Sequence, residues 1–365
     1  MFSYRVSAFI RPARVLKRHL ATQSDGAFSI PIIDFSKFRT AASREEKEKT
    51  AGEIVSAFKS AGFVYLTNHG ITSDEIRNAF AKSADLFKLP NEKKDKLAWE
   101  DPRSNRGYVA IGRERVTQSA DPKEIQSLRE KAPDFKETME IGRDWDADWR
   151  NQWPTETDVP GFKQSMLDFY ETCHDLHVHV MRSIALGLDL NERFFDNKID
   201  EKCHNLRLLS YPPIQRSLLA NDGQARAGAH SDYGTLTLLF QDSVGGLEVQ
   251  NPHTGTFIPA TPVSPLIDKR PLHFKPGSIV VNVGDLLARW SNDVLRSTLH
   301  RVVAPPAKQI NDTQAITPHR QSIAFFCNPN FTAEVACLPN CGDVPKYPAV
   351  NAGDYIVGRL AVTYT

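Results

Sequence analysis

The sequence has 365 residues, 41% of them hydrophobic and 24% charged, which is an ordinary composition for a globular protein with a sizeable core. The 45 basic residues nearly cancel the 44 acidic ones, so no overall field favours nucleic acid or an anionic membrane. The longest apolar runs, such as 279–281, are far below the roughly 18 residues that a membrane helix needs. Five cysteines without regular spacing do not describe a disulfide-stapled secreted protein. Collagen, a coiled coil, a disordered chain and a membrane channel are excluded.

The N-terminal segment 1–28 is basic and has no acidic residue before Asp25. Basic residues, scattered hydroxyls and weak amphipathicity are typical of a mitochondrial transit peptide. A disordered basic tail is the alternative, because Pro12 interrupts any helix there. The sequence therefore leaves a cytoplasmic and a mitochondrial location open, and the fold is predicted from residue 29 onward.

The first half of the chain is predicted to be rich in helices. Apolar residues recur at intervals of three and four residues in two segments, 43–61 and 162–186, and this spacing predicts two amphipathic helices. Gly62 and Gly187 are predicted to end them, and Ser73 is predicted to cap a further helix between them. The other predicted elements are strands at 30–35 and 63–66 and an exposed polar loop at 90–106.

The second half carries many short strand candidates separated by Gly, Pro, Asn and Asp. Short strands that follow a helical half predict an α+β protein, with a helical N-terminal layer packed on an antiparallel barrel or jelly roll. The candidate strands are 206–211, 236–240, 247–250, 278–283, 300–303 and 322–328.

A metal site is predicted from two segments that each open a strand. His230 and Asp232 are two residues apart, so on extended chain their side chains project to the same face. The His-x-Asp pattern alone is weak, but His300 opens another β-branched run. Two imidazoles and one carboxylate form the facial triad of non-haem Fe(II) oxygenases, whereas zinc prefers a tetrahedral site with one open position.

A carboxylate anchor is predicted on a further strand. Arg320 and Ser322 are again two residues apart. A guanidinium and a hydroxyl on one strand face can bind a terminal carboxylate, with two parallel bonds from the guanidinium and one more from the hydroxyl.

Other polar clusters are interpreted as structural. His174, His177 and His179 lack an acid or thiol that would complete a metal set, so we expect a solvated helical face. Cys337 and Cys341 are interpreted as loop cysteines. The charged runs 93–96 and 113–115 are expected at the surface or at the border of a substrate mouth.

Taken together, these motifs resemble one known family. The motifs are His230-x-Asp232, His300, Arg320-x-Ser322 and Tyr211-Pro212-Pro213. They are similar to those of the isopenicillin N synthase-like branch of the Fe(II)/2-oxoglutarate-dependent dioxygenases. The segments 30–34, 62–71 and 106–108 match that family as well, and the resemblance spans 29–335. It implies a double-stranded β-helix (jelly roll) core with an N-terminal helical layer. The expected regions are the helix-rich 29–150, the jelly-roll domain with its preceding helix at 151–335, and a C-terminal extension at 336–365.

The resemblance also implies roles for individual residues. His230, Asp232 and His300 would ligate Fe(II), Arg320 and Ser322 would hold the distal carboxylate of 2-oxoglutarate, and Tyr211 would add a hydrogen bond to it. The expected reaction consumes O2 and 2-oxoglutarate, releases succinate and CO2, and hydroxylates or desaturates a small organic molecule. Plant-type members carry Asn where this chain has Leu209, so one polar contact to the cosubstrate is absent or supplied elsewhere.

Two alternatives remain open from the sequence. Isopenicillin N synthase keeps the Arg-x-Ser pair without using 2-oxoglutarate, so a same-fold oxidase is possible, as is a non-catalytic ligand-binding jelly roll. Neither a nucleic-acid partner nor a membrane partner is expected, and the chain is predicted to be a monomer. Substrate choice is expected to depend on 100–135, 212–228 and the segment after 335.

Overall fold

The computed structural model describes residues 28–40, 43–99, 101, 103–114, 127, 134–219, 225–261, 277–305 and 316–364. The segment 1–27, which holds almost all of the predicted transit peptide, lies outside these ranges. Within the described ranges, no helix has both the length and the apolar character needed to cross a membrane.

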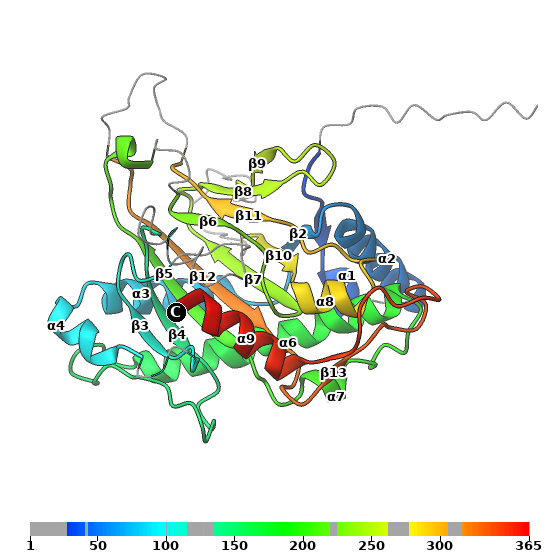
Figure 1. Ribbon diagram of the computed structural model, residues 1–365, viewed down its shortest axis with the longest axis horizontal. Coiled ribbons are helices and arrows are strands. Elements are labelled where there is room, and N and C mark those ends of the chain that lie inside the picture. The colour runs from blue at the N-terminus through cyan, green and yellow to red at the C-terminus, as the bar shows by residue number, and fades with distance from the viewer. Residues whose placement is uncertain are drawn as a thin grey trace, which may run out of the picture.

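Two β-sheets form the centre of the molecule (Figure 1). All of their strand pairs are antiparallel except β1–β2, which is parallel. The major sheet has the order β1 (Ile32–Asp34), β2 (Phe63–Thr67), β10 (Ile279–Val283), β7 (Leu236–Gln241), β12 (Arg320–Cys327), β5 (Asn205–Tyr211), β4 (Glu137–Ile141) and β3 (Gly107–Val109). The minor sheet has the order β6 (Ala227–His230), β11 (His300–Val302), β8 (Leu247–Gln250) and β9 (Phe257–Pro259). A small third sheet pairs β13 (Glu334–Val335) with β14 (Val350–Asn351).

Helices cover the face of the major sheet that lies away from the minor sheet. The long helix α6 (Phe162–Gly187) packs against β7 and β12, and the helices α2 (Arg44–Ser60) and α3 (Ser73–Phe87) pack against α6. The remaining helical segments are α1 (Ser36–Arg39), α4 (Asn91–Lys94), α7 (Asp196–Ile199), α8 (Asp285–Trp290), α9 (Ala352–Tyr364) and the 3-10 turns η1 (Asp95–Leu97) and η2 (Arg216–Leu219).

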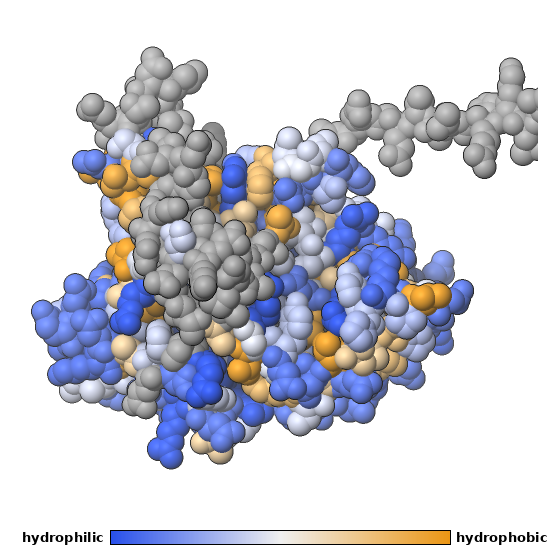
Figure 2. Space-filling view, in the orientation of Figure 1, coloured by the Kyte–Doolittle hydropathy of each residue, from blue (hydrophilic) through white to orange (hydrophobic). Residues whose placement is uncertain are grey.

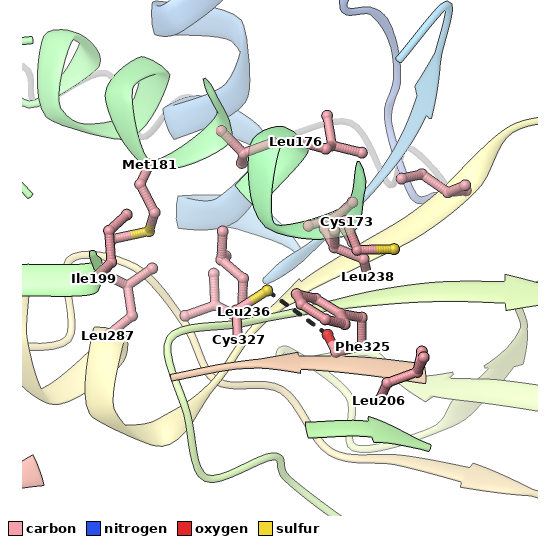
Figure 3. Close-up of a cluster of buried hydrophobic side chains, with 14 of the residues drawn as sticks. Cys173, Leu176, Met181, Ile199, Leu206, Leu236, Leu238, Leu287, Phe325 and Cys327 are labelled. Carbon is pink, nitrogen blue, oxygen red and sulfur yellow. Dashed lines mark hydrogen bonds between the residues drawn. The ribbon is translucent and has the colours of Figure 1, made fainter. Parts of the chain in front are cut away.

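Both faces of the major sheet are buried, which explains why its central strands are rich in apolar residues. One cluster of buried side chains fills the space between the sheet and the helices, where Cys173 and Leu176 of α6 face Leu236, Leu238 and Phe325 of the sheet (Figure 3). A second cluster lies between the two sheets. A strand covered on both faces gains from an apolar residue at every position, and all residues of β5 and β10 are buried. The strands predicted from the second half of the sequence are all present.

The capping residue of α3 differs from the predicted one. Thr72, and not Ser73, is the N-cap: its hydroxyl accepts the backbone N–H of Glu75, and the Glu75 carboxylate accepts the backbone N–H of Thr72. This reciprocal arrangement is a capping box, which satisfies two otherwise free donors. The helix predicted over 43–61 is α2, and Ser43 caps it by accepting the backbone N–H of Glu46.

Gly187 has a different role from the predicted one. It is the last residue of α6 and its φ is not positive, so it does not end the helix by a left-handed turn. A Cβ at this position would lie 2.5 Å from the carbonyl oxygen of Ala51 in α2. Glycine is thus required because α2 and α6 approach each other closely here.

The segment 90–106 is more ordered and more buried than predicted. It contains α4 and η1, and Lys94 is buried in an ion pair with Glu137 at 2.7 Å. The strands β3, β4, β6 and β9 were also not foreseen. On the visible face in Figure 2, polar side chains cover much of the described surface, and apolar residues lie in small groups among them.

Candidate active site

The three predicted metal ligands meet at the edge of the minor sheet. His230 ends β6 and His300 begins β11, and the two residues are direct partners in the antiparallel ladder. Their ring centroids are 4.3 Å apart. Asp232 follows β6, and its Oδ1 lies 3.8 Å from Nε2 of His230 and 3.7 Å from Nε2 of His300. One nitrogen or oxygen of each side chain therefore faces a common point.

Neighbouring groups orient both imidazole rings. Nδ1 of His230 lies 2.7 Å from the carbonyl oxygen of Gly228, and Nδ1 of His300 lies 3.4 Å from that of Thr298. A carbonyl can only accept, so each imidazole carries its proton on Nδ1 and presents the Nε2 lone pair. These contacts are the outer-shell bonds that usually orient metal-binding histidines.

The carboxylate is oriented in the same way. Oδ2 of Asp232 accepts hydrogen bonds from Thr237 at 2.5 Å and from Asn282 at 2.7 Å, which leaves Oδ1 for a metal. The donor set, two neutral imidazoles and one carboxylate, fits Fe(II) bound on one face.

The charge states required for metal binding are favoured by the surroundings. Burial and the adjacent His300 lower the pKa of His230 to about 3, so its ring is neutral at physiological pH. Burial alone would raise the pKa of Asp232, but His300 and His230 and the hydrogen bonds from Asn282 and Thr237 lower it below its ordinary value. Asp232 is therefore ionised.

The predicted carboxylate anchor lines a cavity of about 580 Å³, open space at its mouth included, which the three metal-ligand candidates also line. Arg320 is buried in its wall; its Nη1 donates to the Ser322 hydroxyl at 3.1 Å, and its guanidinium lies 4.8 Å from the ring centroid of Tyr211. Nε of Arg320 has no hydrogen-bond partner among the described residues. We call this the inner cavity.

A second cavity, of about 850 Å³ including its open mouth, adjoins the metal-ligand candidates as well. We call it the outer cavity. His230 and Asp232 line both cavities. The other walls of the outer cavity include Asn105, Arg106 and Glu114 from the N-terminal half and Ile356 and Leu360 from α9. Two of the three segments expected to govern substrate choice thus reach it, whereas none of its described lining residues lies within 212–228.

One pair of strands connects the two cavities. β5 and β12 are antiparallel partners, and alternate residues of a strand face the same side. The paired positions along this face are Tyr211 with Arg320, Leu209 with Ser322, Arg207 with Ala324, and Asn205 with Phe326. The first two pairs line the inner cavity, and Asn205 and Phe326 line the outer one.

A buried charge network adjoins both cavities and was missed from the sequence. Lys136 pairs with Asp134 at 2.7 Å and with Glu114 at 3.0 Å, while Arg207 pairs with Glu114 at 3.2 Å and with Glu140 at 2.7 Å. Of the two expectations for Glu114, the solvated surface was wrong, since its side chain is buried and lines the outer cavity. Only the position of Arg207, on the same strand face as Tyr211, could have signalled this network.

The charged side chains of this network shift one another's pKa values because they lie close together. Burial favours the neutral acid, but Arg207 and Lys136 lower the pKa of Glu114 to about 2. Burial also opposes the charge of Lys136, yet Asp134 and Glu114 raise its pKa. By contrast, burial raises the pKa of Glu140 above its ordinary value.

The position of Leu209 fits the predicted loss of a polar contact. Leu209 lines the inner cavity as an apolar side chain, opposite Ser322. Lys136 lines the same cavity, and its ammonium group pairs with two acidic partners although it has three hydrogens to donate. Lys136 is thus a polar group in the cavity of the predicted carboxylate anchor that the sequence motifs did not reveal.

The interpretation of His174 and His177 as a solvated face was wrong. Both are buried and meet His204, with Nδ1 of His174 3.0 Å from Nε2 of His204. The backbone N–H of Asn328 donates to Nδ1 of His204 at 3.0 Å, so the neutral His204 ring carries its proton on Nε2 and donates it to His174. A nitrogen that carries a proton cannot ligate a metal, and this cluster is a hydrogen-bonded core feature.

Comparison with known proteins agrees with the geometry of the site. Residues 30–156 match the family model described as non-haem dioxygenase in morphine synthesis N-terminal, and residues 201–329 match that of the 2OG-Fe(II) oxygenase superfamily. The chain belongs to the 2OG-Fe(II) oxygenase superfamily. It has the jelly-roll fold of that family, built from sheets and helices.

Curated relatives are similar over almost their whole length. The 2-oxoglutarate-Fe(II) type oxidoreductase ppzD of Metarhizium majus is 36% identical over 354 residues, covering 92% of this chain and 95% of the relative. The 2-oxoglutarate-dependent dioxygenase htyE of Aspergillus rugulosus is 35% identical, covering 90% and 95%.

Among solved structures, a full-length Neurospora crassa protein in complex with alpha-KG and thymine is 45% identical, with a TM-score of 0.81 over 93% of this chain and 99% of that chain. The present protein is therefore a 2-oxoglutarate-dependent dioxygenase that uses Fe(II), 2-oxoglutarate and O2 and acts on a small substrate. Neither the oxidase without 2-oxoglutarate nor the non-catalytic binding protein is favoured.

Proposed function

We propose that His230, Asp232 and His300 bind the Fe(II) of this dioxygenase. The observation that carries the proposal is the convergence of the two Nε2 atoms on Oδ1 of Asp232, with the other atom of each group held by a neighbour. Two imidazoles and one carboxylate leave further positions of an octahedral ion free for other ligands.

The inner cavity is the proposed site for 2-oxoglutarate. Arg320 and Ser322 would hold its distal carboxylate, because the guanidinium is buried and its Nε has no other partner among the described residues. Tyr211 would add a phenolic hydrogen bond from the partner strand. These residues fix the cosubstrate at one end so that its other end reaches the metal.

Bound Fe(II) and 2-oxoglutarate supply the oxidising chemistry, which yields succinate and CO2 and oxidises a C–H bond of the substrate. The chain's own residues position the reactants and exclude water from the inner cavity. Tyr211 and Leu209, for example, are nearly inaccessible to solvent. Hydroxylation is the proposed outcome, and desaturation is a variant.

The outer cavity is the proposed substrate site, and a small planar heterocycle of the thymine type is the proposed substrate. The support is the likeness to the Neurospora crassa protein, whose complex contains thymine, together with the lining of the cavity. Aromatic side chains such as Phe326 and Phe331 can stack on a flat ring, and Arg207 and the asparagines can bond to its polar edge.

The regions expected from the sequence are proposed as functional units of one fold. In this proposal 29–150 contributes a helical supporting layer, 151–335 the jelly-roll domain with its preceding helix, and 336–365 an extension whose helix α9 lines the outer cavity. The proposed oligomeric state is a monomer. The basic segment 1–28 supports a mitochondrial location, with a cytoplasmic one as the alternative.

An anaerobic titration tests the proposed metal and cosubstrate sites. Fe(II) followed by 2-oxoglutarate should produce the visible metal-to-ligand charge-transfer band, and the band should be lost in Arg320→Ala. Aerobic addition of thymine should then accelerate succinate release. A band without stimulation by thymine would reject the substrate class alone, while a band that persists in Arg320→Ala would reject the proposed anchor.

A further inference from the structure

Three residues that line the outer cavity have a buried polar atom without a partner in the described part of the chain. Oδ1 of Asn205, Oδ1 of Asn105 and Nε of Arg106 are buried and have no hydrogen bond among the described residues. All three residues line the outer cavity. A buried polar group without a partner carries its full desolvation penalty, so such groups are rare in native proteins and call for an explanation.

The orientation of the Asn205 amide is fixed by the backbone. Its Nδ2 donates to the carbonyl oxygen of Asn105 at 2.9 Å. Because the nitrogen is engaged there, the oxygen of the same amide must point elsewhere and can only accept. Asn105 holds its carbonyl in place through a left-handed backbone conformation, with a φ of 49°.

Arg106 lines the same cavity, and its Nε is a donor without a partner among the described residues. Its Nη1 is occupied by the carbonyl oxygens of Ser104 and Asn105, at 3.1 and 2.9 Å. Its side chain packs so closely on Gly142 that a Cβ there would lie 1.9 Å from the guanidinium carbon. The guanidinium therefore has little freedom to turn Nε toward another partner.

The rest of this wall suits a flat molecule. Asn205 is the direct ladder partner of Phe326, whose side chain lines the same cavity. A ring that stacks on Phe326 would bring its edge to the amide oxygen of Asn205.

We propose that Asn205 and Arg106 recognise a cyclic amide or imide edge of the substrate, with the Asn205 oxygen accepting a ring N–H and the Arg106 Nε donating to an adjacent carbonyl oxygen. This inference rests on the proposed function of the outer cavity and makes Asn205 a specificity-determining residue. Sites built to bond a substrate N–H reject analogues that lack it, because the site's own polar atom is then left unpaired.

Discrimination between N–H and N-methyl analogues tests the proposal. The full chain, loaded with Fe(II) and 2-oxoglutarate, is assayed for succinate release with thymine and with its two mono-N-methyl derivatives. The wild-type protein should prefer thymine over one derivative by about 10- to 100-fold. In Asn205→Leu, which keeps the side-chain size and removes the acceptor, this preference should fall below about threefold. An unchanged preference in the variant would overturn the proposal.

A matched control separates recognition from folding. Asn330 is also a buried asparagine, bonded to Asp200 at 2.7 Å, but does not line either cavity. Asn330→Leu is therefore expected to keep the preference for N–H substrates. Both variants must retain the charge-transfer band, which reports an intact metal and cosubstrate site.

A binding measurement keeps the inference testable even if thymine is not a substrate. Glutarimide and N-methylglutarimide are titrated into the chain loaded with Mn(II) and 2-oxoglutarate. If glutarimide binds at least about tenfold more tightly and Asn205→Leu abolishes the difference, the imide edge is recognised although the thymine proposal fails. If neither thymine nor glutarimide binds, or if the N-methyl compound binds equally well, the inference is wrong.

Discussion

Arg320 lies directly opposite Tyr211 in the β5–β12 ladder, with its guanidinium 4.8 Å from the tyrosine ring centroid. The same ladder places Phe326 opposite Asn205 at its far end. The extended chain from Arg320 to Phe326 spans about 20 Å. The proposed cosubstrate and substrate sites are thus positioned by one pair of strands, with the metal-ligand candidates beside both cavities.

Replacing Arg320 should weaken cosubstrate binding selectively. Charge-assisted hydrogen bonds to a carboxylate contribute about 1.5–3 kcal/mol each, so Arg320→Met should raise the KM for 2-oxoglutarate by about 100-fold or more. Arg320→Lys keeps the charge but loses the planar fork, and a smaller rise is expected. Steady-state kinetics measure both values, and Mn(II) binding should be unaffected. An unchanged KM in Arg320→Met would contradict the assignment.

Removing the support of Asp232 should weaken metal binding without removing a ligand. Asn282 donates to Oδ2 of Asp232 at 2.7 Å. Loss of such an outer-shell bond typically costs about 10- to 100-fold in metal affinity, so Asn282→Ala should raise the Kd for Mn(II) by that factor in calorimetry. Asn330→Ala, which removes a buried asparagine away from the site, serves as the control. Equal Kd values for the two variants would count against His230, Asp232 and His300 as the metal site.

Glu114 and Glu140 should affect the pH dependence of stability in opposite directions. The folded pKa of Glu114, about 2, lies below its ordinary value of 4.5. Its contribution is therefore present above pH 4.5 and is lost as the pH falls toward 2, and the difference between these pKa values corresponds to about 3 kcal/mol. Glu140 has a raised pKa, so its contribution is present below pH 4.5 and is lost as the pH rises through the folded pKa.

Urea unfolding of the two glutamine variants measures this difference. At pH 7, Glu114→Gln should lower the free energy of unfolding by about 3 kcal/mol, because Lys136 and Arg207 lose a buried partner charge. The deficit should shrink as the pH falls below 4.5. Glu140→Gln should cost less than Glu114→Gln at pH 7, because the raised pKa of Glu140 means that its surroundings stabilise the charged form less. Equal losses of unfolding free energy in both variants would show that the surroundings of Glu114 and Glu140 do not shift the two pKa values in opposite directions.

Adding a methyl group at Gly187 should destabilise the protein although alanine favours helices. The new Cβ would lie 2.5 Å from the carbonyl oxygen of Ala51, and forcing α2 and α6 apart should cost about 1–3 kcal/mol. Gly52 also lies in α2, where an added Cβ would have nothing within 4 Å, so Gly52→Ala should instead gain up to about 1 kcal/mol. Thermal unfolding of the two variants should shift in opposite directions.

Much of the site could be predicted because its signals are local. His230 and Asp232, like Arg320 and Ser322, stand two residues apart, and this spacing alone places each pair on one face of a strand. The apolar runs of β5, β7, β10 and β12 identify strands because both faces of the major sheet are buried.

What the sequence could not reveal depends on contacts between distant residues. Glu114 and Lys136 look like ordinary surface charges, but in the folded chain both are buried and Glu114 pairs with Lys136 and Arg207. His204 joins His174 from a segment 30 residues away, which reversed the interpretation of that helix face.

The sequence by itself determined the chemistry of this protein, because short motifs contain both the candidate metal ligands and the candidate carboxylate anchor. The tertiary structure decided which residues surround the proposed substrate site. Strand pairing sets Asn205 against Phe326 and folds Asn105, Arg106 and helix α9 around the same cavity. Burial and unpaired hydrogen-bonding atoms are properties of the packed chain, and no local pattern of residues specifies them.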